Sequence, residues 1–314
     1  MKKILVLGCG SVGRRHINNI LKYNFDIHGF DTDKQRVQGI NRIENYEDSF
    51  NEHWDGVVVC TPPALHIPQS LPFLKKNIPV FMEKPLAITL QDSLSLMSFA
   101  TPENFLMGYT YRWWKPIIEL KKLIDSQEVG NILHINACMA AHLADWHPYE
   151  NYKDFFMSKR ELGGGALLDE SHILDIMLWF FGPPKNVFAS VRKVSKLEIT
   201  TDDNVDVILY YENFNIYIHL DLYTRPHKKN ISIIGEQGNL IWDFNKIIIE
   251  KEEKKEILFE LDRNEMFVNA MQYFVDMINK QTINHYSTYN NGLNVMRLIE
   301  QIRESQEKGE RIDI

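Results

Sequence analysis

The stretch that decides the fold lies at the start of the chain and reads ILVLGCGSVG, residues 4–13. Its four leading apolar residues predict a buried strand, and a glycine turn follows at once. The pattern G-x-G-x-x-G between a strand and a helix is typical of a dinucleotide-binding turn. The first glycine permits a tight turn, the second lets the backbone approach a pyrophosphate, and the third allows close packing of helix on strand. The expected cofactor contacts are therefore Gly8, Gly10, Ser11, Val12 and Gly13.

An acidic residue supports this interpretation. Asp31 follows the next predicted strand, residues 25–30, and stands 18 residues beyond Gly13. A carboxylate at this point accepts hydrogen bonds from the adenosine ribose and repels a 2′-phosphate. The sequence therefore favours NAD as the cofactor. NADP is the alternative, because Lys34 and Arg36 partly offset the repulsion.

The first third of the chain alternates short apolar runs with helical segments, which is typical of a parallel sheet built from βαβ units. After residue 114, strands follow one another without intervening helices, which predicts a largely antiparallel sheet. The fold class is therefore α/β. A doubly wound parallel domain (1–114) binds NAD(P), and an α+β domain (115–314) binds substrate and forms oligomer contacts; its last helix can pack back on the first domain.

The expected strands are residues 4–7, 25–30, 56–60, 80–83, 105–109, 132–139, 187–194, 205–211, 216–224, 230–234, 240–244 and 246–250. The expected helices are residues 16–23, 68–76, 90–99, 117–126, 166–180, 266–279 and 290–304. The charged run 250–256 is interpreted as a solvated turn.

Two strand ends carry further candidates. Thr61 and Pro62 follow the third strand at the edge where such sheets bind ligands; they either contact the cofactor or only end the strand. His66, near the start of the next helix, is expected at the cofactor site, where it supports the residues that contact the cofactor; the alternative is a surface histidine. Glu83 and Lys84 end the fourth strand, and both are expected near the cofactor. A lysine there either holds a substrate hydroxyl and stabilises developing oxyanion charge, or simply leaves the strand at the surface.

The stretch GGGALLDESHILD, residues 163–175, contains the densest group of candidate catalytic side chains. Asp169, His172 and Asp175 recur at i, i+3 and i+6 of a predicted helix, so adjacent pairs share a face. Histidine titrates near neutrality and suits proton abstraction from an alcohol, with a carboxylate to orient the ring. The alternative is a helix-face histidine without chemistry. A metal site is disfavoured because no further ligand stands at suitable spacing.

Composition excludes several classes of protein. The 314 residues are 44% hydrophobic and 25% charged, as in an ordinary globular protein, and the net charge of −7 argues against nucleic acid as a partner. Three widely spaced cysteines fit a reducing cytosol. No apolar run is long enough for a membrane helix, and no signal peptide is recognised, so we expect a cytoplasmic protein without membrane contact.

With these motifs in place, the sequence resembles the glucose-fructose oxidoreductase and inositol dehydrogenase family (Gfo/Idh/MocA) over nearly its whole length. The resemblance rests on GCGSVG at 8–13, EKP at 83–85, GYTYR at 108–112, GGGALLDESHILD at 163–175 and IIGEQGNLIWD at 233–243. It implies a Rossmann domain, a second domain with a large open sheet, and nicotinamide-dependent oxidation or reduction of sugars, inositols and sugar derivatives.

The resemblance also implies that Lys84 and His172 are catalytic. The family usually spaces its aspartate and histidine as D-x-x-x-H, whereas Asp169 and His172 read D-x-x-H. Asp175 matches the common H-x-x-D and therefore competes with Asp169 as the partner of His172.

The loop 141–156 is rich in aromatic residues and histidine. It looks like the loop of relatives encoded with bacterial surface-polysaccharide or nonulosonic-acid pathways. Trp146, His147 and Tyr152 are expected either to line a sugar pocket or to pack within the loop. Arg112, just past a strand end, is expected to bind an anionic group or hydroxyl of the substrate.

The expected function is a cytosolic oxidoreductase that acts on a secondary alcohol of a sugar or nucleotide sugar. The alternatives are an NADPH-dependent reductase of a ketone or unsaturated intermediate, and a catalytically silent nucleotide-binding protein, since fold alone does not establish function. Apolar residues of the strand 216–220 on an uncovered face predict a homodimer or homotetramer through the second sheet.

Overall fold

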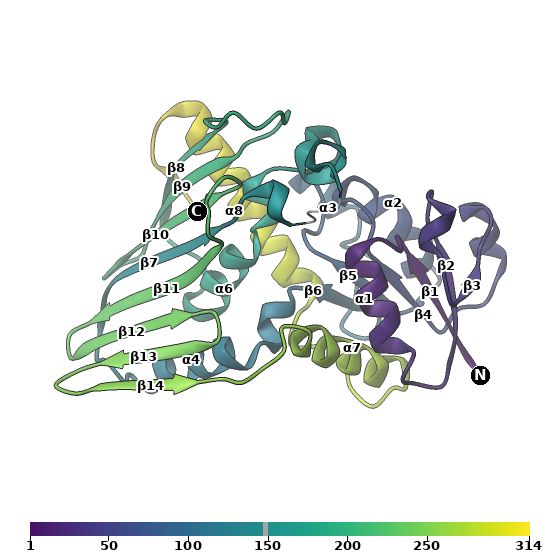
Figure 1. The fold of residues 1–314 in the computed structure, drawn as a ribbon, viewed down its shortest axis with the longest axis horizontal. Coiled ribbons are helices and arrows are strands. Elements are labelled where there is room, and N and C mark those ends of the chain that lie inside the picture. Colours follow the sequence, from purple (N-terminus) through teal and green to yellow (C-terminus); the bar gives the residue numbers. More distant parts are fainter. Residues whose placement is uncertain (147–149) are drawn as a thin grey trace. The chain divides into compact units, whose positions relative to one another are not determined.

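The computed structural model describes residues 1–146 and 150–314. The chain forms two compact units (Figure 1), and each is described by itself. Unit 1 comprises Met1–Trp113 and Arg263–Met296, and unit 2 comprises Trp114–Asp262 and Arg297–Ile314.

Unit 1 contains a six-stranded parallel sheet with the order β3-β2-β1-β4-β5-β6. This is the strand order of dinucleotide-binding folds, and it places the ends of β1 and β4 side by side. The strands are apolar because both faces of such a sheet are buried. Their bounds are β1 (Lys2–Leu7), β2 (Phe25–Phe30), β3 (Asn41–Arg42), β4 (Gly56–Val59), β5 (Val80–Glu83) and β6 (Phe105–Gly108).

The helices of unit 1 are α1 (Ser11–Ile20), α2 (Pro63–Leu74), α3 (Leu90–Leu94) and α7 (Glu265–Ile278), with the short 3₁₀ segments η1 (Lys34–Arg36), η2 (Tyr46–Asn51) and η3 (Thr110–Trp113). α8 (Tyr289–Lys308) begins in unit 1, and its residues from Arg297 belong to unit 2.

Unit 1 is built from two separate segments, so a single domain boundary at residue 114 does not divide the chain into its two units. Phe274 and Ile278 of α7 share one buried core with Ile17 and Ile20 of α1, so this late segment belongs to unit 1. The sequence pattern predicted the helix at residues 266–279, but it did not predict which surface the apolar face of this helix covers.

Unit 2 contains a nine-stranded sheet with the order β14-β13-β12-β11-β7-β10-β9-β8-β15. All neighbouring pairs are antiparallel except β7 and β10, which confirms the prediction of a mostly antiparallel sheet. The strands are β7 (Ile132–Ala140), β8 (Asn186–Arg192), β9 (Asn204–Tyr210), β10 (Asn215–Asp221), β11 (Lys228–Gly235), β12 (Gly238–Asp243), β13 (Lys246–Glu250), β14 (Lys254–Leu258) and β15 (Ile312–Asp313).

The charged run 250–256 is more than a solvated turn. Its second half begins β14, which pairs with β13 from Lys254 opposite Glu250 to Leu258 opposite Lys246. The strand stands at the sheet edge and carries few apolar residues, so its side-chain pattern resembles a loop.

Helices cover one face of this sheet. α4 (Lys115–Asp125), α6 (His172–Phe181) and the end of α8 lie on the same side of the strands (Figure 1). The short α5 (Ala166–Asp169) contacts β9 and β10. The connecting 3₁₀ segments are η4 (Leu143–Asp145), η5 (Tyr152–Asp154), η6 (Phe156–Ser158) and η7 (Arg160–Leu162).

The apolar residues of β10 point to the helix-covered face, contrary to the prediction. Ile216, Ile218 and Leu220 are at most 2% exposed, whereas Tyr217 on the opposite face is 42% exposed. We call this opposite face, which carries Tyr217, His219 and Phe188, the outer face.

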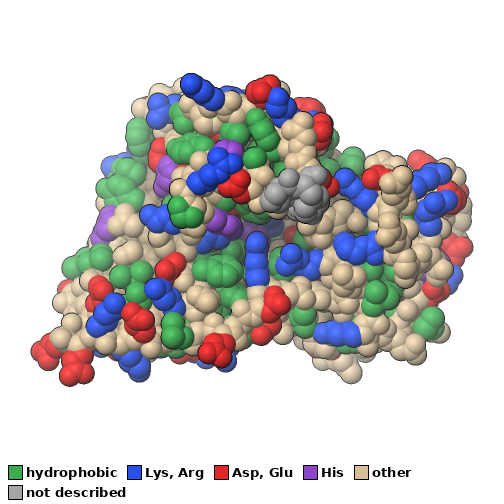
Figure 2. Space-filling model, viewed as in Figure 1, with side chains coloured by type: hydrophobic (Ala, Val, Ile, Leu, Met, Phe, Trp, Pro, Cys, Tyr) green, Lys and Arg blue, Asp and Glu red, His purple; other side chains and the backbone are tan. Residues whose placement is uncertain are grey.

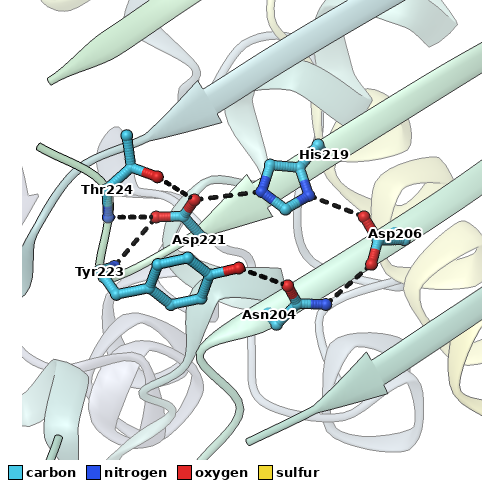
Figure 3. A network of polar contacts seen from close by, with 6 residues as sticks. All are labelled: Asn204, Asp206, His219, Asp221, Tyr223 and Thr224. Atoms are coloured by element: carbon cyan, nitrogen blue, oxygen red, sulfur yellow. Dashed lines mark hydrogen bonds and ion pairs between the residues drawn. The ribbon is translucent and has the colours of Figure 1, made fainter. Parts of the chain in front are cut away.

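A polar network lies at one end of the outer face (Figure 3). The ring of His219 stands between two carboxylates, with Nδ1 2.7 Å from Asp206 and Nε2 3.1 Å from Asp221. Asp221 also accepts hydrogen bonds from Tyr223 and Thr224. These contacts raise the pKa of His219 to about 9, the hydrogen bond to Asp221 being the largest cause.

On the molecular face drawn in Figure 2, acidic and basic side chains of the described residues are interspersed rather than gathered by sign. Within the described ranges, none of the helices combines the length and the apolar character required to cross a bilayer.

Candidate functional site

The glycine turn of unit 1 is closely packed. A Cβ atom on Gly13 would stand 1.9 Å from the carbonyl oxygen of Gly8, so only glycine fits where α1 meets the turn. Gly10 caps α1, and a Cβ there would meet only Arg36 Nη1, at 3.4 Å. The exposed Ser11 begins the helix. Open space beside Gly10 and the first amides of a ten-residue helix fit the diphosphate of a dinucleotide.

Asp31 lies at this turn, as the spacing predicts. Its carboxylate accepts the backbone N–H of Cys9 at 2.7 Å and that of Asp33 at 2.9 Å. These two hydrogen bonds hold the carboxylate beside the glycine turn, and each oxygen keeps a further lone pair for a ribose hydroxyl. Lys34, predicted to offset the charge of Asp31, instead pairs with Glu44 at 3.0 Å.

The turn after β4 is fixed by a buried histidine. His66 is fully buried, with Nδ1 2.7 Å from the carbonyl of Pro85 and Nε2 2.8 Å from that of Thr61. Burial lowers the pKa of His66. Both ring nitrogens face protein carbonyls, so His66 positions the Thr61–Pro62 turn and the Lys84–Pro85 turn. The burial of His66 excludes the alternative of a surface histidine. Contact of Thr61, Pro62 and His66 with the cofactor remains a prediction.

Glu83 and Lys84 leave the end of β5 in different environments. The Glu83 carboxylate lies 2.7 Å from Nε2 of His16, a fully buried residue of α1, so Glu83 fastens β5 to the nucleotide-binding helix. Lys84 follows at the carboxyl end of the sheet and is partly exposed. The catalytic role of Lys84 remains a prediction.

Arg112 is buried in unit 1, at 3% exposure. Its Nη1 donates to the carbonyl of Tyr286 at 2.6 Å, and the Tyr286 hydroxyl donates to the carbonyl of Arg112. The pair ties η3 to the segment before α8. The predicted contact of Arg112 with a substrate remains a prediction.

In unit 2 the candidate helix is interrupted. α5 ends at Asp169 and α6 begins at His172, with Glu170 and Ser171 between them, whereas the sequence predicted one helix over 166–180. Asp169 and Asp175 are 5% and 1% exposed. The helical spacing across the interruption therefore does not settle which carboxylate orients His172, and both remain candidates.

A clamp that the sequence did not reveal holds α5. The Asp202 carboxylate accepts the N–H of Leu167 at 2.9 Å, and the Asp202 carbonyl accepts that of Ala166 at 3.1 Å. Thr201 donates its hydroxyl to the carbonyl of Gly164 at 3.0 Å. A Cβ on Gly165 would stand 2.4 Å from both side chains, so the glycine run brings the backbone against this loop. Burial raises the pKa of Asp202.

A second contact that the sequence did not reveal joins the strand β11 to two other segments of unit 2. Lys229 Nζ on β11 lies 3.2 Å from Glu170, with 4% and 2% of the side chains exposed. The same ammonium lies 5.6 Å from the centre of the Trp146 ring. The backbone around Trp146 is fixed further by Asp145, which accepts two hydrogen bonds of 2.7 Å from Arg225.

Two of the three predicted sugar-binding residues of the aromatic loop, Trp146 and Tyr152, have contacts within unit 2. The Trp146 ring centre lies 6.0 Å from that of His227. The Tyr152 hydroxyl accepts the N–H of Glu198 at 3.3 Å, so Tyr152 contacts the 195–200 loop. His147 lies outside the described residues. Sugar binding by these three residues remains a prediction.

No group of three His, Cys, Asp or Glu residues suited to a metal ion occurs in the two described ranges. Cys9, Cys60 and Cys138 are free, and burial raises the pKa of Cys9 to about 12.

Two models of one protein family match the chain. Residues 2–111 match the oxidoreductase family model with an NAD-binding Rossmann fold, and residues 117–241 match the GFO/IDH/MocA C-terminal domain. A curated relative is glucose-6-phosphate 3-dehydrogenase of Bacillus subtilis, 27% identical over 220 residues. That match covers 67% of this chain and 62% of the relative.

Two solved structures share the fold. An inositol dehydrogenase homolog complexed with NAD+ from Azotobacter vinelandii has a TM-score of 0.86 at 19% identity. The WlbA dehydrogenase from Bordetella pertussis, in complex with NADH and UDP-GlcNAcA, has a TM-score of 0.80 at 20% identity. Each comparison covers 100% of this chain and 97% of the other. With both domain models matched in order, the chain belongs to the Gfo/Idh/MocA family of oxidoreductases with an NAD-binding Rossmann fold.

Proposed function

We propose that the protein oxidises a secondary alcohol of a sugar, sugar derivative or nucleotide sugar, or reduces the corresponding ketone. The observation that carries this proposal is the match to both domain models, combined with Lys84 at the end of β5 and His172 at the start of α6. A nicotinamide cofactor, when bound, takes up or supplies the hydride at C4 of its ring.

The chain's own residues handle the proton and the developing charge. Lys84 donates a hydrogen bond to the reacting oxygen and stabilises its negative charge. His172 accepts the hydroxyl proton as the C–H bond breaks, so that a carbonyl forms at the substrate carbon. Asp169 or Asp175 orients the imidazole and stabilises its charged form.

The substrate class is proposed from the relatives. WlbA is crystallised with a nucleotide sugar, and the Bacillus subtilis relative is named for a sugar phosphate. A role in bacterial surface-polysaccharide or nonulosonic-acid biosynthesis is the pathway that the loop 141–156 suggests. We place the protein in the cytoplasm, in keeping with its three free cysteines.

The test is a turnover assay with NAD+ and a panel of inositols, sugar phosphates, uronates and UDP-sugars, followed by nicotinamide absorbance. For the substrate that reacts, Lys84→Ala and His172→Ala should each lower kcat by about 100-fold or more. NADH affinity should stay nearly intact in both variants, because neither residue lies at the glycine turn.

Matched controls are Lys122→Ala and His53→Ala, whose side chains are 68% and 85% exposed. Near-normal kcat in either active-site variant would remove that residue from the mechanism. NADH binding without turnover of any substrate would support the silent nucleotide-binding alternative.

A further inference from the structure

One buried imidazole lies between two turns of unit 1. The ring of His66, in α2, stands between the carbonyl of Thr61, after β4, and the carbonyl of Pro85, after β5. Thr61 belongs to the predicted cofactor turn, and Pro85 directly follows the catalytic candidate Lys84. His66 therefore joins the turn expected at the cofactor to the turn expected at the reacting oxygen.

The two contacts of His66 require more protons than a neutral ring carries. Nδ1 lies 2.7 Å from the Pro85 oxygen and Nε2 lies 2.8 Å from the Thr61 oxygen, and both oxygens are acceptors. A neutral imidazole has one N–H, so only the charged ring donates to both. His16 differs, because among the described residues only its Nε2 has a hydrogen-bond partner, the Glu83 carboxylate, and one proton is enough.

The surroundings of the His66 ring favour its neutral form. Burial is the largest influence and lowers the pKa of His66, and the charge of Lys84 acts in the same direction. The two carbonyls and the Glu83 carboxylate oppose this shift. The thiol of Cys60, next to Thr61, stays uncharged because burial raises its pKa well above the usual value. The ring therefore carries one proton near neutral pH and gains the second in acid.

The burial of the two contacts indicates which nitrogen keeps the single proton. The contact with Pro85 is fully buried, whereas the contact with Thr61 is partly exposed, where water can replace a missing donor. A buried carbonyl without a donor costs more free energy than a hydrated one. The neutral ring therefore keeps its proton on Nδ1 and donates to Pro85.

We propose that His66 is a positioning residue whose second contact depends on a proton. The neutral ring holds the Lys84–Pro85 turn, which places the Lys84 ammonium for the reaction. Protonation of Nε2 adds the hydrogen bond that orders the Thr61 turn for the cofactor. The first part rests on the proposed function, because it assumes that Lys84 takes part in the reaction, whereas the second part concerns NAD+ binding alone.

The first experiment observes the ring by nitrogen-15 NMR of the full-length wild-type protein labelled at histidine. The His66 signals are identified by their loss in a His66 variant. At pH 7.5 they should show a proton on Nδ1 and none on Nε2, and both nitrogens should become protonated with a midpoint below pH 6.5. A proton on Nε2 at pH 7.5, or no titration between pH 5 and pH 8, would overturn the proposal.

The second experiment is a calorimetric titration with NAD+ between pH 5 and pH 8, without any sugar substrate. The wild-type affinity should rise about fivefold as the pH falls through the His66 midpoint, as one added hydrogen bond allows. Bound NAD+ should by reciprocity move that midpoint to higher pH. In His66→Asn and His66→Gln the affinity should not vary with pH. A flat wild-type profile, or an unaltered slope in both variants, would contradict the second contact.

Turnover separates the two contacts. Asparagine places its amide near the position of Nδ1 and glutamine near that of Nε2, so asparagine is the better substitute for the bond to Pro85. Both variants should lower kcat at pH 7.5, and His66→Gln should lower it about fivefold more than His66→Asn. The order should be reversed for NAD+ affinity, because glutamine is the better donor to Thr61.

His28→Asn and His28→Gln are the matched controls, since His28 lies in β2, where it pairs with Asp26. Both should leave kcat and NAD+ affinity unchanged, and thermal unfolding of every variant checks its folding. Equal kcat in the two His66 variants would exclude the positioning of Lys84. If no substrate reacts, or if Lys84→Ala turns over normally, the proposed function fails, and the NMR and NAD+ titrations still decide the proton-dependent contact.

Discussion

The Lys229 ammonium and the Glu170 carboxylate lie 3.2 Å apart and almost out of contact with solvent. Glu170 stands between Asp169, which ends α5, and His172, which begins α6. Because Lys229 comes from β11, the pair fixes the interruption between the two helices to the sheet. Any movement of Glu170 would shift the two candidate catalytic side chains on either side of it.

Removal of one partner should therefore be costly. Lys229→Met leaves a buried carboxylate without this cation and should lower the free energy of unfolding by about 3–5 kcal/mol. The double variant Lys229→Met/Glu170→Met should recover most of that loss, because no isolated charge remains. Urea unfolding followed by circular dichroism measures both.

Lys185→Met provides the control, since Lys185 pairs with Glu212 at the surface and should contribute less than about 1 kcal/mol. Equal stability of the two lysine variants would show that the buried pair has no such role.

At this scale the sequence predicted residues that belong to local motifs. The positions of Gly13 and Asp31 at the glycine turn, and of Lys84 after β5, could be predicted because strand, turn and helix fix them within a few residues of the chain. Lys229 and Asp202 could not, because their partners Glu170 and Leu167 lie 59 and 35 residues away. A lone lysine in a strand and a lone aspartate in a loop carry no signal of such pairing.

Among the elements, α5 depends most on its surroundings. It has four residues and follows the glycine run, so it cannot be stable by itself. The Asp202 carboxylate satisfies one of its first N–H groups, in the manner of a helix cap.

Asp202→Ala should lower the free energy of unfolding by about 1–2 kcal/mol. It should also lower kcat while leaving the KM for NAD+ nearly unchanged, because α5 carries Asp169 while the nucleotide turn belongs to unit 1. Asp202→Asn keeps an oxygen acceptor and should restore much of both losses. Identical kcat in the alanine variant and the wild type would argue against this positioning role.

The strands β9 and β10 carry a pH-dependent contact in the polar network of Figure 3. The pKa of His219 is raised to about 9 by Asp221 and Asp206, above its usual value of about 6.5. A raised pKa in the folded protein means that the stabilisation is complete below about pH 6.5 and is lost as the pH rises through about 9. Depression of the Asp221 pKa acts at the acidic end, where its contribution is lost as the pH falls.

The side chain of His219 is 36% exposed, so solvent screening reduces the effect to about 1 kcal/mol. We expect the free energy of unfolding to fall by that amount between pH 6.5 and pH 10, and His219→Gln to remove this part of the pH dependence. Parallel urea titrations at several pH values measure it. An identical pH dependence in the glutamine variant would rule out His219 as its origin.

The pattern of apolar residues predicted most elements but not their ends or interruptions. β2, β5 and β13 run over the predicted residues, because in each strand the apolar residues give way to an acidic residue, Asp31, Glu83 and Glu250 respectively. The break at Glu170–Ser171 could not be predicted, because the contacts that hold the residues around it, the buried Lys229 pair and the Asp202 clamp, come from distant strands and loops. The edge strand β14 was missed because it needs no apolar face.

On the scale of the whole molecule, the outer face of the second sheet bears on assembly. Tyr217 and Phe188 are 42% and 38% exposed there, and the ring of Tyr217 lies 5.0 Å from that of His134. We propose, as the sequence suggested, that the protein forms a homodimer or homotetramer through this sheet. The supporting residues differ from the predicted Ile216, Ile218 and Leu220, which face the helices.

Sedimentation at micromolar concentrations should therefore show a dimer or tetramer, and Tyr217→Glu should shift it towards monomer by burying a charge in the contact. Met97→Glu, at a 53% exposed position of unit 1, should leave the assembly unchanged. A wild-type monomer throughout this range would refute the proposed assembly.

The packing of α7 against α1 limits how the nucleotide-binding part could be separated or inherited. A fragment that ends at residue 113 would keep the entire parallel sheet and the glycine turn, yet it would leave Ile17 and Ile20 without the cover that Phe274 and Ile278 provide. The gene therefore does not encode two modules in series. Recombination, truncation or domain grafting at residue 114 would cut through one hydrophobic core, and exchange between relatives has to retain both ends of the chain together.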